Sequence, residues 1–182
     1  GARAGSERVR NKNTRILGGK PLISHTLDTA LNIKNIQNIV VSSNDPAVKE
    51  IVSDYKDIIY IDRPNEISTS ISQDIEWILH VFETVNQDIF IKLPPTSPFR
   101  KVDFIEKSVE EFTNGEKYDS ARAVALCKEH PGKMWVIDSG NLVALETDLV
   151  YDSSTSMHAG QYQDLPEVYV QTSSLEISRS SS

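Results

Sequence analysis

The apolar positions of the first 127 residues predict helices and strands in alternation. Helical spacing predicts a helix after Pro21 that carries Leu22, Ile23, Thr26, Leu27, Ala30 and Leu31. Short β-branched runs predict buried strands at residues 38–42, 57–61, 88–93 and 120–127. Three further helices are expected between these strands: residues 46–55, one carrying Ile75, Ile78, Leu79 and Phe82, and one carrying Phe104, Ile105, Val109 and Phe112.

Turn and cap residues separate these segments. Residues 43–46 (S-N-D-P) supply helix N-cap chemistry with a proline near the first turn, and Asp103 can cap the last of the helices. Prolines at residues 94–98 force a turn after the third strand. Strands that alternate with helices predict an α/β fold with a mainly parallel sheet and right-handed crossovers.

The pattern changes after residue 127. Residues 134–137 and 142–145, joined by D-S-G-N, predict a hairpin, and residues 148–163 are polar and irregular. We therefore expect a single domain over residues 1–182, in which residues 131–170 or so form a small protruding flap or dimerisation arm. We also expect the chain to be trimmed at both ends, since it starts inside a loop.

Charge and composition narrow the function. A net charge of −7 over 182 residues argues against a nucleic-acid partner, and no apolar run approaches the length of a membrane span. Cys127 is the one cysteine, which fits a reducing compartment, and we expect it to be buried. Cytoplasm is the expected location. The four histidines lack metal-ligand spacing, which favours structural roles.

The first thirteen residues, G-A-R-A-G-S-E-R-V-R-N-K-N, combine small residues with four cations. Small residues let backbone N–H groups approach a ligand, and the cations suit a polyphosphate. An ordinary basic surface loop is the alternative, because short patterns of this kind often arise without a ligand. Other loops expected at the carboxyl ends of strands, where ligands bind in an open parallel sheet, are residues 42–45, 62–66 and 94–100.

Four motifs occur in one order: A-R-A-G-S-E-R-V-R-N-K-N, L-G-G-K-P-L-I-S-H-T-L, R-P-N-E-I and L-P-P-T-S-P-F-R. This order resembles the acylneuraminate cytidylyltransferase family, from residue 2 to about residue 170. The resemblance implies a Rossmann-like three-layer sandwich, a homodimer, and an enzyme that transfers CMP from CTP to an acidic, sialic-acid-like sugar with release of pyrophosphate. It also implies a requirement for Mg²⁺, whose ligands the sequence does not assign.

The resemblance further implies site residues. Arg3, Ser6, Lys12 and Asn13 correspond to the triphosphate grip, with catalytic roles for Arg3, Lys12 and Asn13. Arg63, Ser70, Ser72 and Pro95 correspond to the rest of the nucleotide site; a surface ion pair is the alternative for Arg63. Thr96, Ser97, Lys133 and Tyr169 correspond to the sugar pocket. Fixed cations and donors suit phosphoryl transfer, which needs no protein nucleophile.

The chain departs from the family pattern at several positions. Glu7 stands where a lysine is usual, and Pro94 stands where a glutamine is usual. Tyr162 replaces an arginine linked to the sugar carboxylate, and residues 171–176 replace N-G-A-I-Y. These differences favour a related acidic or modified sugar over sialic acid itself.

Two alternatives remain beside a cytidylyltransferase. One is a nucleotidyltransferase of the same superfamily that uses another nucleotide or sugar. The other is a nucleotide-binding homologue that has lost catalysis, motivated by Glu7 and Pro94.

Overall fold

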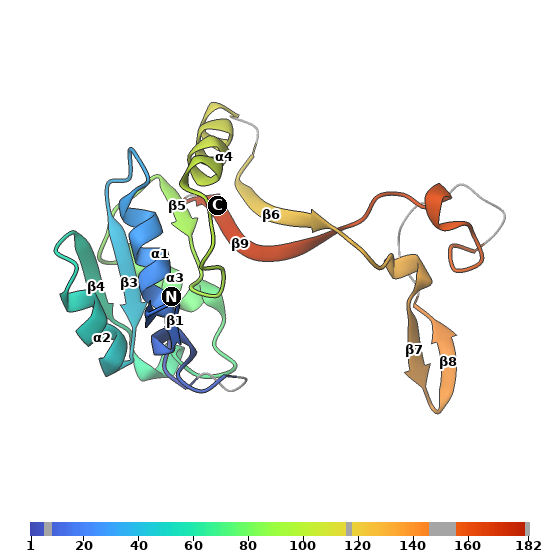
Figure 1. Cartoon of the computed structure of the whole chain (residues 1–182), viewed down its shortest axis with the longest axis horizontal. Helices are drawn as coiled ribbons and strands as arrows, with labels where there is room; N and C mark the ends of the chain where they lie inside the picture. Colours follow the sequence, from blue (N-terminus) through green and yellow to red (C-terminus); the bar gives the residue numbers. More distant parts are fainter. Residues whose placement is uncertain (6–8, 116–117, 146–155, 181–182) are drawn as a thin grey trace. The chain divides into compact units, whose positions relative to one another are not determined.

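The computed structural model describes residues 1–5, 9–115, 118–145 and 156–180. The chain forms two compact units, the first made of Gly1–Arg122 with Ser173–Ser182 and the second of Ala123–Thr172. Figure 1 follows the chain through both. The second unit contains residues 131–170, the segment for which the sequence predicts a flap or arm.

The elements of the first unit alternate as the sequence predicts. Its helices are α1 (Leu22–Leu31), α2 (Pro46–Ser53), α3 (Asp74–Phe82) and α4 (Val102–Asn114). Its strands are β1 (Ile16–Leu17), β2 (Lys20–Pro21), β3 (Ile39–Ser43), β4 (Ile58–Asp62) and β5 (Ile89–Lys92), with parts of β6 (Ser120–Leu126) and β9 (Tyr169–Arg179). Two short 3₁₀ helices, η1 (Lys12–Thr14) and η2 (Asn65–Ile67), lie in the loops.

The strands pair in both directions. β3 and β4 are parallel, in register from Ile39 opposite Ile58 to Ser43 opposite Asp62. β5 and β9 are antiparallel, and the order of their sheet is β5-β9-β6. The α/β class is therefore confirmed, and the sheets combine parallel with antiparallel pairs, because β9 returns from the end of the chain in the opposite direction.

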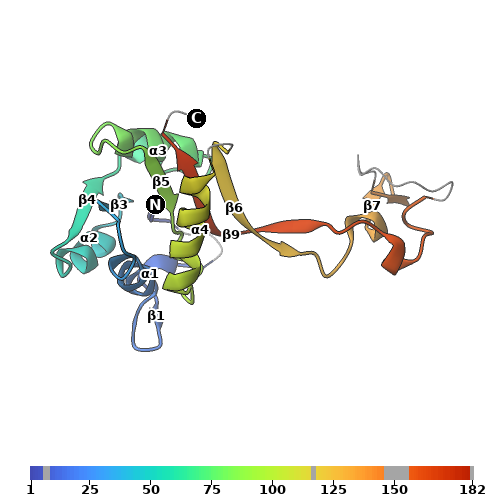
Figure 2. The ribbon, with the colours of Figure 1, turned by 90° about the horizontal axis from the view of Figure 1, so that it is seen from above.

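Helices cover both faces of these strands. Comparison of Figures 1 and 2 shows α1 and α3 on opposite sides of β3 and β5. One core cluster joins α1 and α2 to β3, through Ile23, Leu27, Val41, Val48 and Val52. A second cluster joins α3 to β4, through Ile61, Trp77 and Val81. The layered sandwich follows from these two apolar layers.

The buried face of α3 differs from the sequence prediction. Ile75 and Leu79 are 52% and 55% exposed, whereas Trp77 and Val81 are buried. Trp77 takes the inward position because an indole ring buries more apolar area than an isoleucine, and its Nε1 donates to Asp74 Oδ1 at 2.9 Å. The helix is therefore rotated from the predicted orientation, with Ile78 and Phe82 at the side of the core.

On α4 the prediction is correct for Ile105 and Phe112, which are buried, and wrong for Phe104, which is 56% exposed. Lys101 occupies the N-cap position, and Asp103 lies in the first turn instead of capping it. A carboxylate in the first turn still interacts favourably with the positive end of the helix dipole.

The second unit contains the predicted hairpin. β7 (Trp135–Asp138) and β8 (Asn141–Ala144) are antiparallel, and the turn residues Ser139 and Gly140 have φ of 51° and 84°. Positive φ at both central residues is the requirement of a type I′ turn, which matches the twist of the strands. The unit also holds η3 (Pro131–Lys133) and η4 (Tyr162–Asp164). Residues 148–155 of the predicted polar segment lie outside the described residues.

Two residues near β6 and β9 differ from simple strand behaviour. Cys127 is partly exposed, so the prediction that it is buried is wrong: Val124 and Leu126 before it are each 54% exposed, and the apolar run lies on an open strand. Ser173, within β9, has a φ of 52°, the left-handed region that favours glycine.

In the parts of the chain described here, no helix is both long and apolar enough to cross a membrane.

The cap of α2 gives a test of local stability. Asp45 accepts a hydrogen bond from the Ala47 N–H at 3.0 Å, which satisfies one of the free donors of the first turn. Replacing Asp45 with alanine should lower the free energy of unfolding by about 1 kcal/mol. Asp45→Ser should retain most of this stabilisation, because a serine side chain can also cap the helix. Urea denaturation measures both, and equal loss in the two variants would contradict the capping role.

Candidate functional site

The candidate site lies where β3 and β4 end. Residues 1–5 return to this edge: Ala2 N donates to Ser42 O at 3.0 Å, and Ser43 Oγ donates to Ala2 O at 2.6 Å. Ala4 N donates to Asn44 Oδ1 at 2.9 Å. The opening loop is therefore fixed to the carboxyl end of β3, as an open α/β sheet requires of a ligand loop.

Arg3 and Asn13 are brought together within this loop. The Asn13 side chain is buried, and its Nδ2 donates to Arg3 O at 3.3 Å. Lys12 begins η1 and is partly exposed, and Asn11 before it has a φ of 52°. Gly5 has a φ of 70°, and nothing lies close to the position that a Cβ would take. A glycine is therefore favoured there by the backbone conformation and not by close packing. Ser6 and Glu7 lie outside the described residues.

Arg63 is buried beneath the loop. Its Nε donates to Ser42 Oγ at 3.0 Å and its Nη2 to Ser42 O at 2.7 Å, while the guanidinium stacks 5.1 Å from the centre of the Trp77 ring. Burial lowers the pKa of Arg63 to about 10, so it stays charged at neutral pH. The surface ion pair considered from the sequence is wrong. Arg63 supports the strand end that carries the loop.

Ser70 and Ser72 lie in the loop between η2 and α3. Ser72 Oγ accepts from Thr69 N at 3.0 Å, and Thr69 Oγ1 accepts from Ser72 N at 3.2 Å, which makes a compact turn. Ser70 is exposed within this turn. Both hydroxyl-bearing residues therefore belong to a loop that follows β4, on the same edge as Arg63.

The loop after β5 is held by Arg100, which the sequence analysis did not single out. Its guanidinium donates to Pro94 O, to Ser174 O on β9 and, at 3.4 Å, to Thr26 Oγ1 on α1. Burial lowers the pKa of Arg100 to about 10. Within the loop so fixed, Pro95 is buried, Thr96 is exposed and Ser97 is partly exposed. Pro94 contributes its carbonyl to Arg100 and to Ser97 N.

A second group missed from the sequence is centred on Lys92. Its Nζ lies 2.5 Å from Asp74 Oδ2 and 3.0 Å from Glu176 Oε1. Burial by itself would raise the pKa of Asp74, but hydrogen bonds from Lys92 and Trp77 outweigh burial and lower it. Burial would likewise lower the pKa of Lys92, but its two carboxylate partners raise it. This triad joins α3, β5 and β9.

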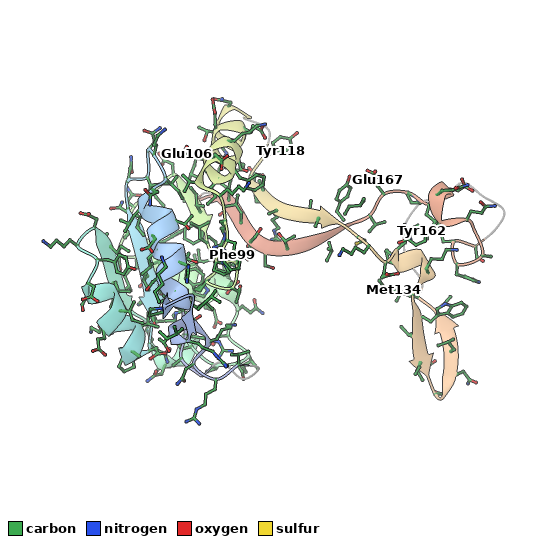
Figure 3. The ribbon with its side chains drawn as sticks, viewed as in Figure 1. Phe99, Glu106, Tyr118, Met134, Tyr162 and Glu167 are labelled. Atoms are coloured by element: carbon green, nitrogen blue, oxygen red, sulfur yellow. The ribbon has the colours of Figure 1, made fainter. Side chains whose placement is uncertain are left out.

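Lys133, Tyr162 and Tyr169 belong to the second unit. Lys133 Nζ donates to His158 O at 3.0 Å and to Gly160 O. Tyr162 Oη donates to Lys128 O at 2.6 Å, and Tyr169 Oη donates to Glu167 Oε2 at 2.7 Å. Figure 3 labels Tyr162 and Glu167 in this unit. The structure accordingly gives these residues local roles inside their own unit.

Histidines with described contacts have structural partners. His130 is buried, and its ring accepts from Gly132 N at 2.9 Å and lies 2.9 Å from Pro166 O; His25 Nε2 lies 2.8 Å from Leu17 O. No group of three His, Cys, Asp or Glu side chains within the described ranges could hold a metal ion. The described carboxylates therefore provide no three-residue magnesium site.

A layered α/β domain with its polar loops gathered at the carboxyl ends of parallel strands is typical of nucleotide-binding proteins. Comparison with known proteins identifies the family within this class. The family model described as Cytidylyltransferase matches residues 1–175. The chain belongs to the cytidylyltransferase family.

Curated relatives carry more specific names. Over 152 residues the chain is 36% identical to a CMP-N,N'-diacetyllegionaminic acid synthase of Legionella pneumophila, covering 80% of this chain and 64% of that protein. Over 124 residues it is 32% identical to an N-acylneuraminate cytidylyltransferase of Escherichia coli, covering 68% of this chain and 29% of that protein. The chain thus spans less than two thirds of the length of either relative.

A solved structure supports the fold. A CMP:2-keto-3-deoxy-manno-octonic acid synthetase complexed with CTP matches 98% of this chain and 71% of its own, with a TM-score of 0.70 and 18% identity. At this identity the match shows that the two chains share an architecture.

The Lys92 triad predicts a pH-dependent effect on stability. Because the folded-state pKa of Asp74 is lowered, its charge stabilises the fold above the ordinary carboxyl pKa, and this stabilisation disappears as pH falls through the lowered value. Asp74→Asn should therefore destabilise the protein at about pH 7, and this destabilisation should shrink progressively as pH falls below the ordinary carboxyl pKa of about 4. Urea midpoints across this range measure the difference, with exposed Asp57→Asn as the control. A loss that is constant across the range would contradict this assignment.

Proposed function

We propose that the protein is a cytidylyltransferase that transfers CMP from CTP to an acidic nonulosonic sugar, with release of pyrophosphate. The proposal rests on the family and on the names of its relatives, which are a CMP-sugar synthase and an acylneuraminate cytidylyltransferase. A pseudaminic acid cytidylyltransferase of Campylobacter jejuni, 25% identical over 178 residues, adds a third acidic nine-carbon sugar. The substrate class is therefore proposed as acidic nonulosonic sugars in general.

The observation that carries the proposal is the attachment of the opening loop to the end of β3. Three loop atoms, Ala2 N, Ala2 O and Ala4 N, are fixed there by hydrogen bonds to Ser42, Ser43 and Asn44. Within the loop, Asn13 Nδ2 holds Arg3 O. A loop held in this way presents its cations without reorganisation when the triphosphate arrives, which is the condition for strong electrostatic stabilisation. Arg3 and Lys12 supply the charges in the proposed site.

The chemistry balances without a protein nucleophile. An oxygen–phosphorus bond forms between the hydroxyl of the sugar and the α-phosphorus of CTP, and the bond from that phosphorus to the bridging oxygen of the pyrophosphate breaks. The hydroxyl proton leaves to solvent. Negative charge spreads over the α-phosphoryl oxygens, where Arg3 and Lys12 would stabilise it, while Asn13 would keep the loop in position.

The remaining assignments complete the proposed site. Ser6, Ser70, Ser72 and Pro95 would contact the nucleotide beside the loop, and Arg63 would support them from below through Ser42. Thr96 and Ser97 would contact the sugar. The same role for Lys133 and Tyr169 is a prediction of the family resemblance. Tyr162 and Glu176, which differ from the family pattern, are already engaged by Lys128 and Lys92, so their contribution to sugar choice would be indirect.

Magnesium, a dimer and a cytoplasmic location are part of the proposal. Mg²⁺ commonly binds through substrate phosphates with one or two carboxylates, and it would neutralise phosphate charge when CTP is bound. Apolar side chains on the hairpin of the second unit, Met134, Trp135, Val136, Ile137, Leu142 and Val143, are exposed. A second copy of the chain is the proposed cover for this apolar surface.

The full-length protein should lose turnover when Lys12 is replaced by alanine. Removing one donor from a charge-stabilising site costs about 10²-fold in rate, so pyrophosphate release with CTP and a nonulosonic sugar should fall by about that factor. Asn13→Ala should also reduce it, by releasing Arg3 O. Exposed Arg15→Ala is the matched control. Unchanged activity in Lys12→Ala and Asn13→Ala would overturn the site.

Nucleotide binding by the full-length protein distinguishes the cytidylyltransferase from the two alternative functions. A nucleotide at about 100 times its dissociation constant should stabilise the fold by about 2.7 kcal/mol, so thermal shifts with CTP, UTP, GTP and ATP identify the one bound. Preference for another nucleotide would favour the related transferase. Binding of CTP with no turnover of any acidic sugar would favour the non-catalytic homologue.

A substitution on the β7–β8 hairpin tests the proposed dimer. Ile137 is 79% exposed, and a carboxylate placed there would have to be buried in a dimer formed through this surface. Ile137→Asp should therefore weaken self-association at least about tenfold, as measured by analytical ultracentrifugation. Exposed Lys128→Asp, in the same unit, is the control. A monomer in the parent protein, or equal association in both variants, would contradict the proposal.

A further inference from the structure

Pro94 lies where the hydrogen-bond ladder between β5 and β9 would continue. The register of these antiparallel strands places Lys92, the last residue of β5, opposite Glu176. Two positions further along, the same register places Pro94 opposite Ser174. Figures 1 and 2 both show β5 and β9 side by side. The loop of residues 94–98 therefore begins directly beside β9.

One ladder bond is missing at this pair, because proline has no N–H group. In an antiparallel ladder, every second pair of opposite residues exchanges its backbone hydrogen bonds. Ser180 N donates to Asp88 O at 3.0 Å, so this pair is of the hydrogen-bonded kind. Steps of two positions from it reach Pro94 and Ser174. Ser174 O is therefore the acceptor that the N–H of an ordinary residue would reach from the position of Pro94.

The guanidinium of Arg100 takes the place of this missing donor. Its Nε donates to Ser174 O and its Nη2 to Pro94 O, so one planar group bridges the two opposite carbonyls. Its Nη1 donates to Thr26 Oγ1 on α1 at 3.4 Å. Among the described residues no carboxylate forms an ion pair with Arg100. The directions of its donors therefore define its role, and the single nitrogen of a lysine does not reproduce them.

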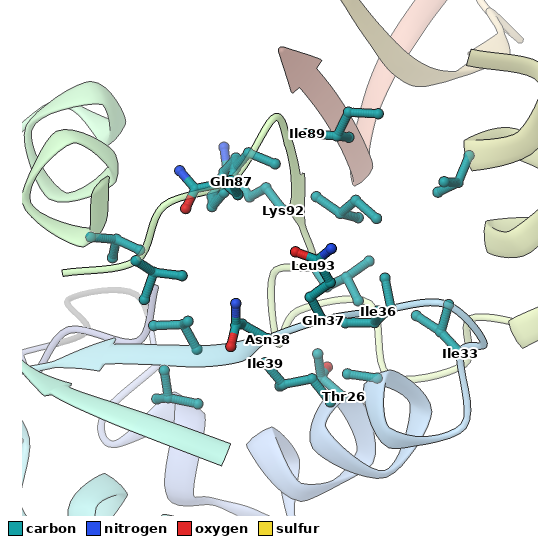
Figure 4. A pocket seen from close by; sticks show the side chains of 18 of the residues that line it. Thr26, Ile33, Ile36, Gln37, Asn38, Ile39, Gln87, Ile89, Lys92 and Leu93 are labelled. Carbon is teal, nitrogen blue, oxygen red and sulfur yellow. The ribbon is translucent and has the colours of Figure 1, made fainter. Parts of the chain in front are cut away.

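The contact with Thr26 is important because α1 and the end of β5 are not closely packed. Thr26, Lys92 and Leu93 line one cavity of about 840 Å³, and Figure 4 shows their side chains around it. Across such a space, atoms lack the van der Waals partners that would otherwise hold two elements at a fixed separation. The hydrogen bond from Arg100 supplies a fixed contact between the loop and α1.

The loop that Arg100 holds contains the residues proposed to contact the sugar. Ser97 N donates to Pro94 O at 3.3 Å, and this carbonyl is the one that Arg100 binds. Pro95 is buried, whereas Thr96 is exposed and Ser97 is partly exposed. The Pro94 carbonyl thus connects the guanidinium to the turn that presents Thr96 and Ser97. Movement of this carbonyl would move the turn.

We propose that Arg100 is a positioning residue, whose guanidinium replaces the ladder bond that Pro94 cannot make and thereby fixes residues 94–98 for the sugar. The inference rests on the proposed function for the identity of the ligand, but the geometry of the loop does not depend on that function. Arg100 acts through the loop and needs no contact with either substrate. Misplacement of orienting groups by about 1 Å can cost about 10²-fold in rate, so this role has a measurable effect.

Amide hydrogen exchange of the full-length protein without substrate tests the loop. Arg100→Met removes the donors and keeps most of the apolar stem, so exchange of the Ser97 amide should accelerate at least about tenfold. The Arg63 amide, which donates to Ser43 O at 2.9 Å in the same unit, should exchange as before. Lys107→Met on the exposed face of α4 is the matched control. Should Arg100→Met fail to fold, Arg100→Lys tests the same effect.

Pro94→Ala tests the replacement of the ladder bond, because alanine restores an N–H at this position. In the Arg100→Met background it should slow exchange of the Ser97 amide, since the new N–H can donate to Ser174 O. In the parent protein it should change little, because Arg100 already binds this carbonyl. The difference between the two backgrounds measures the coupling of the two residues. Equal effects in both backgrounds would overturn the inference.

Turnover tests the consequence for the reaction. Arg100→Met should lower kcat/KM for the acidic sugar about 10- to 100-fold, and Pro94→Ala in that background should restore part of it. Affinity for inorganic triphosphate, a probe of the opening loop alone, should be unchanged in Arg100→Met and reduced in Lys12→Ala.

Two results would contradict the positioning role: unaltered exchange of Ser97 in Arg100→Met, or full turnover despite accelerated exchange. A parent protein that turns over no acidic sugar would instead overturn the proposed function. The exchange measurements would still decide whether Arg100 fixes the loop, because they need no substrate.

Discussion

The structure depends on the attachment of the opening loop to the carboxyl end of β3. Ser42 O accepts from both Ala2 N and the guanidinium of Arg63, and the Ser43 hydroxyl donates to Ala2 O. A serine hydroxyl donates and accepts at once, so two adjacent serines connect the loop, two strands and a buried arginine within one small volume. Loop position and strand packing are therefore coupled, and neither can change without the other.

Buried and half-buried cations act in the same way elsewhere in the first unit. Arg63, Arg100 and Lys92 each lie at the end of a strand or in the loop that follows it, and each is bound by groups from at least two elements. Burying a charge is costly unless its hydrogen bonds are supplied, and leaving one partner out costs more than the bond itself contributes. These residues therefore fix the loops of the candidate site with little tolerance for displacement.

The order of elements could be predicted from the sequence, because the β-branched runs and cap residues such as Asp45 act locally. The hairpin was predictable for the same reason, since Ser139-Gly140 suits one type of turn. The buried face of α3 was not, because the contest between Ile75 and Trp77 is decided by neighbours from β4 and β5. Arg100 and Lys92 were not predicted from the sequence, since one partner of each, Ser174 and Glu176, lies 74 and 84 positions away along the chain.

Ser173 restricts which amino acids β9 can accept at one position. With a φ of 52°, this residue adopts a backbone conformation that costs an ordinary side chain about 1–3 kcal/mol. Glycine, asparagine and aspartate adopt it most readily, whereas the valine and isoleucine that otherwise suit a strand do not. Over evolutionary time the substitution spectrum at this one position should therefore be that of a tight turn, although both of its neighbours belong to a strand.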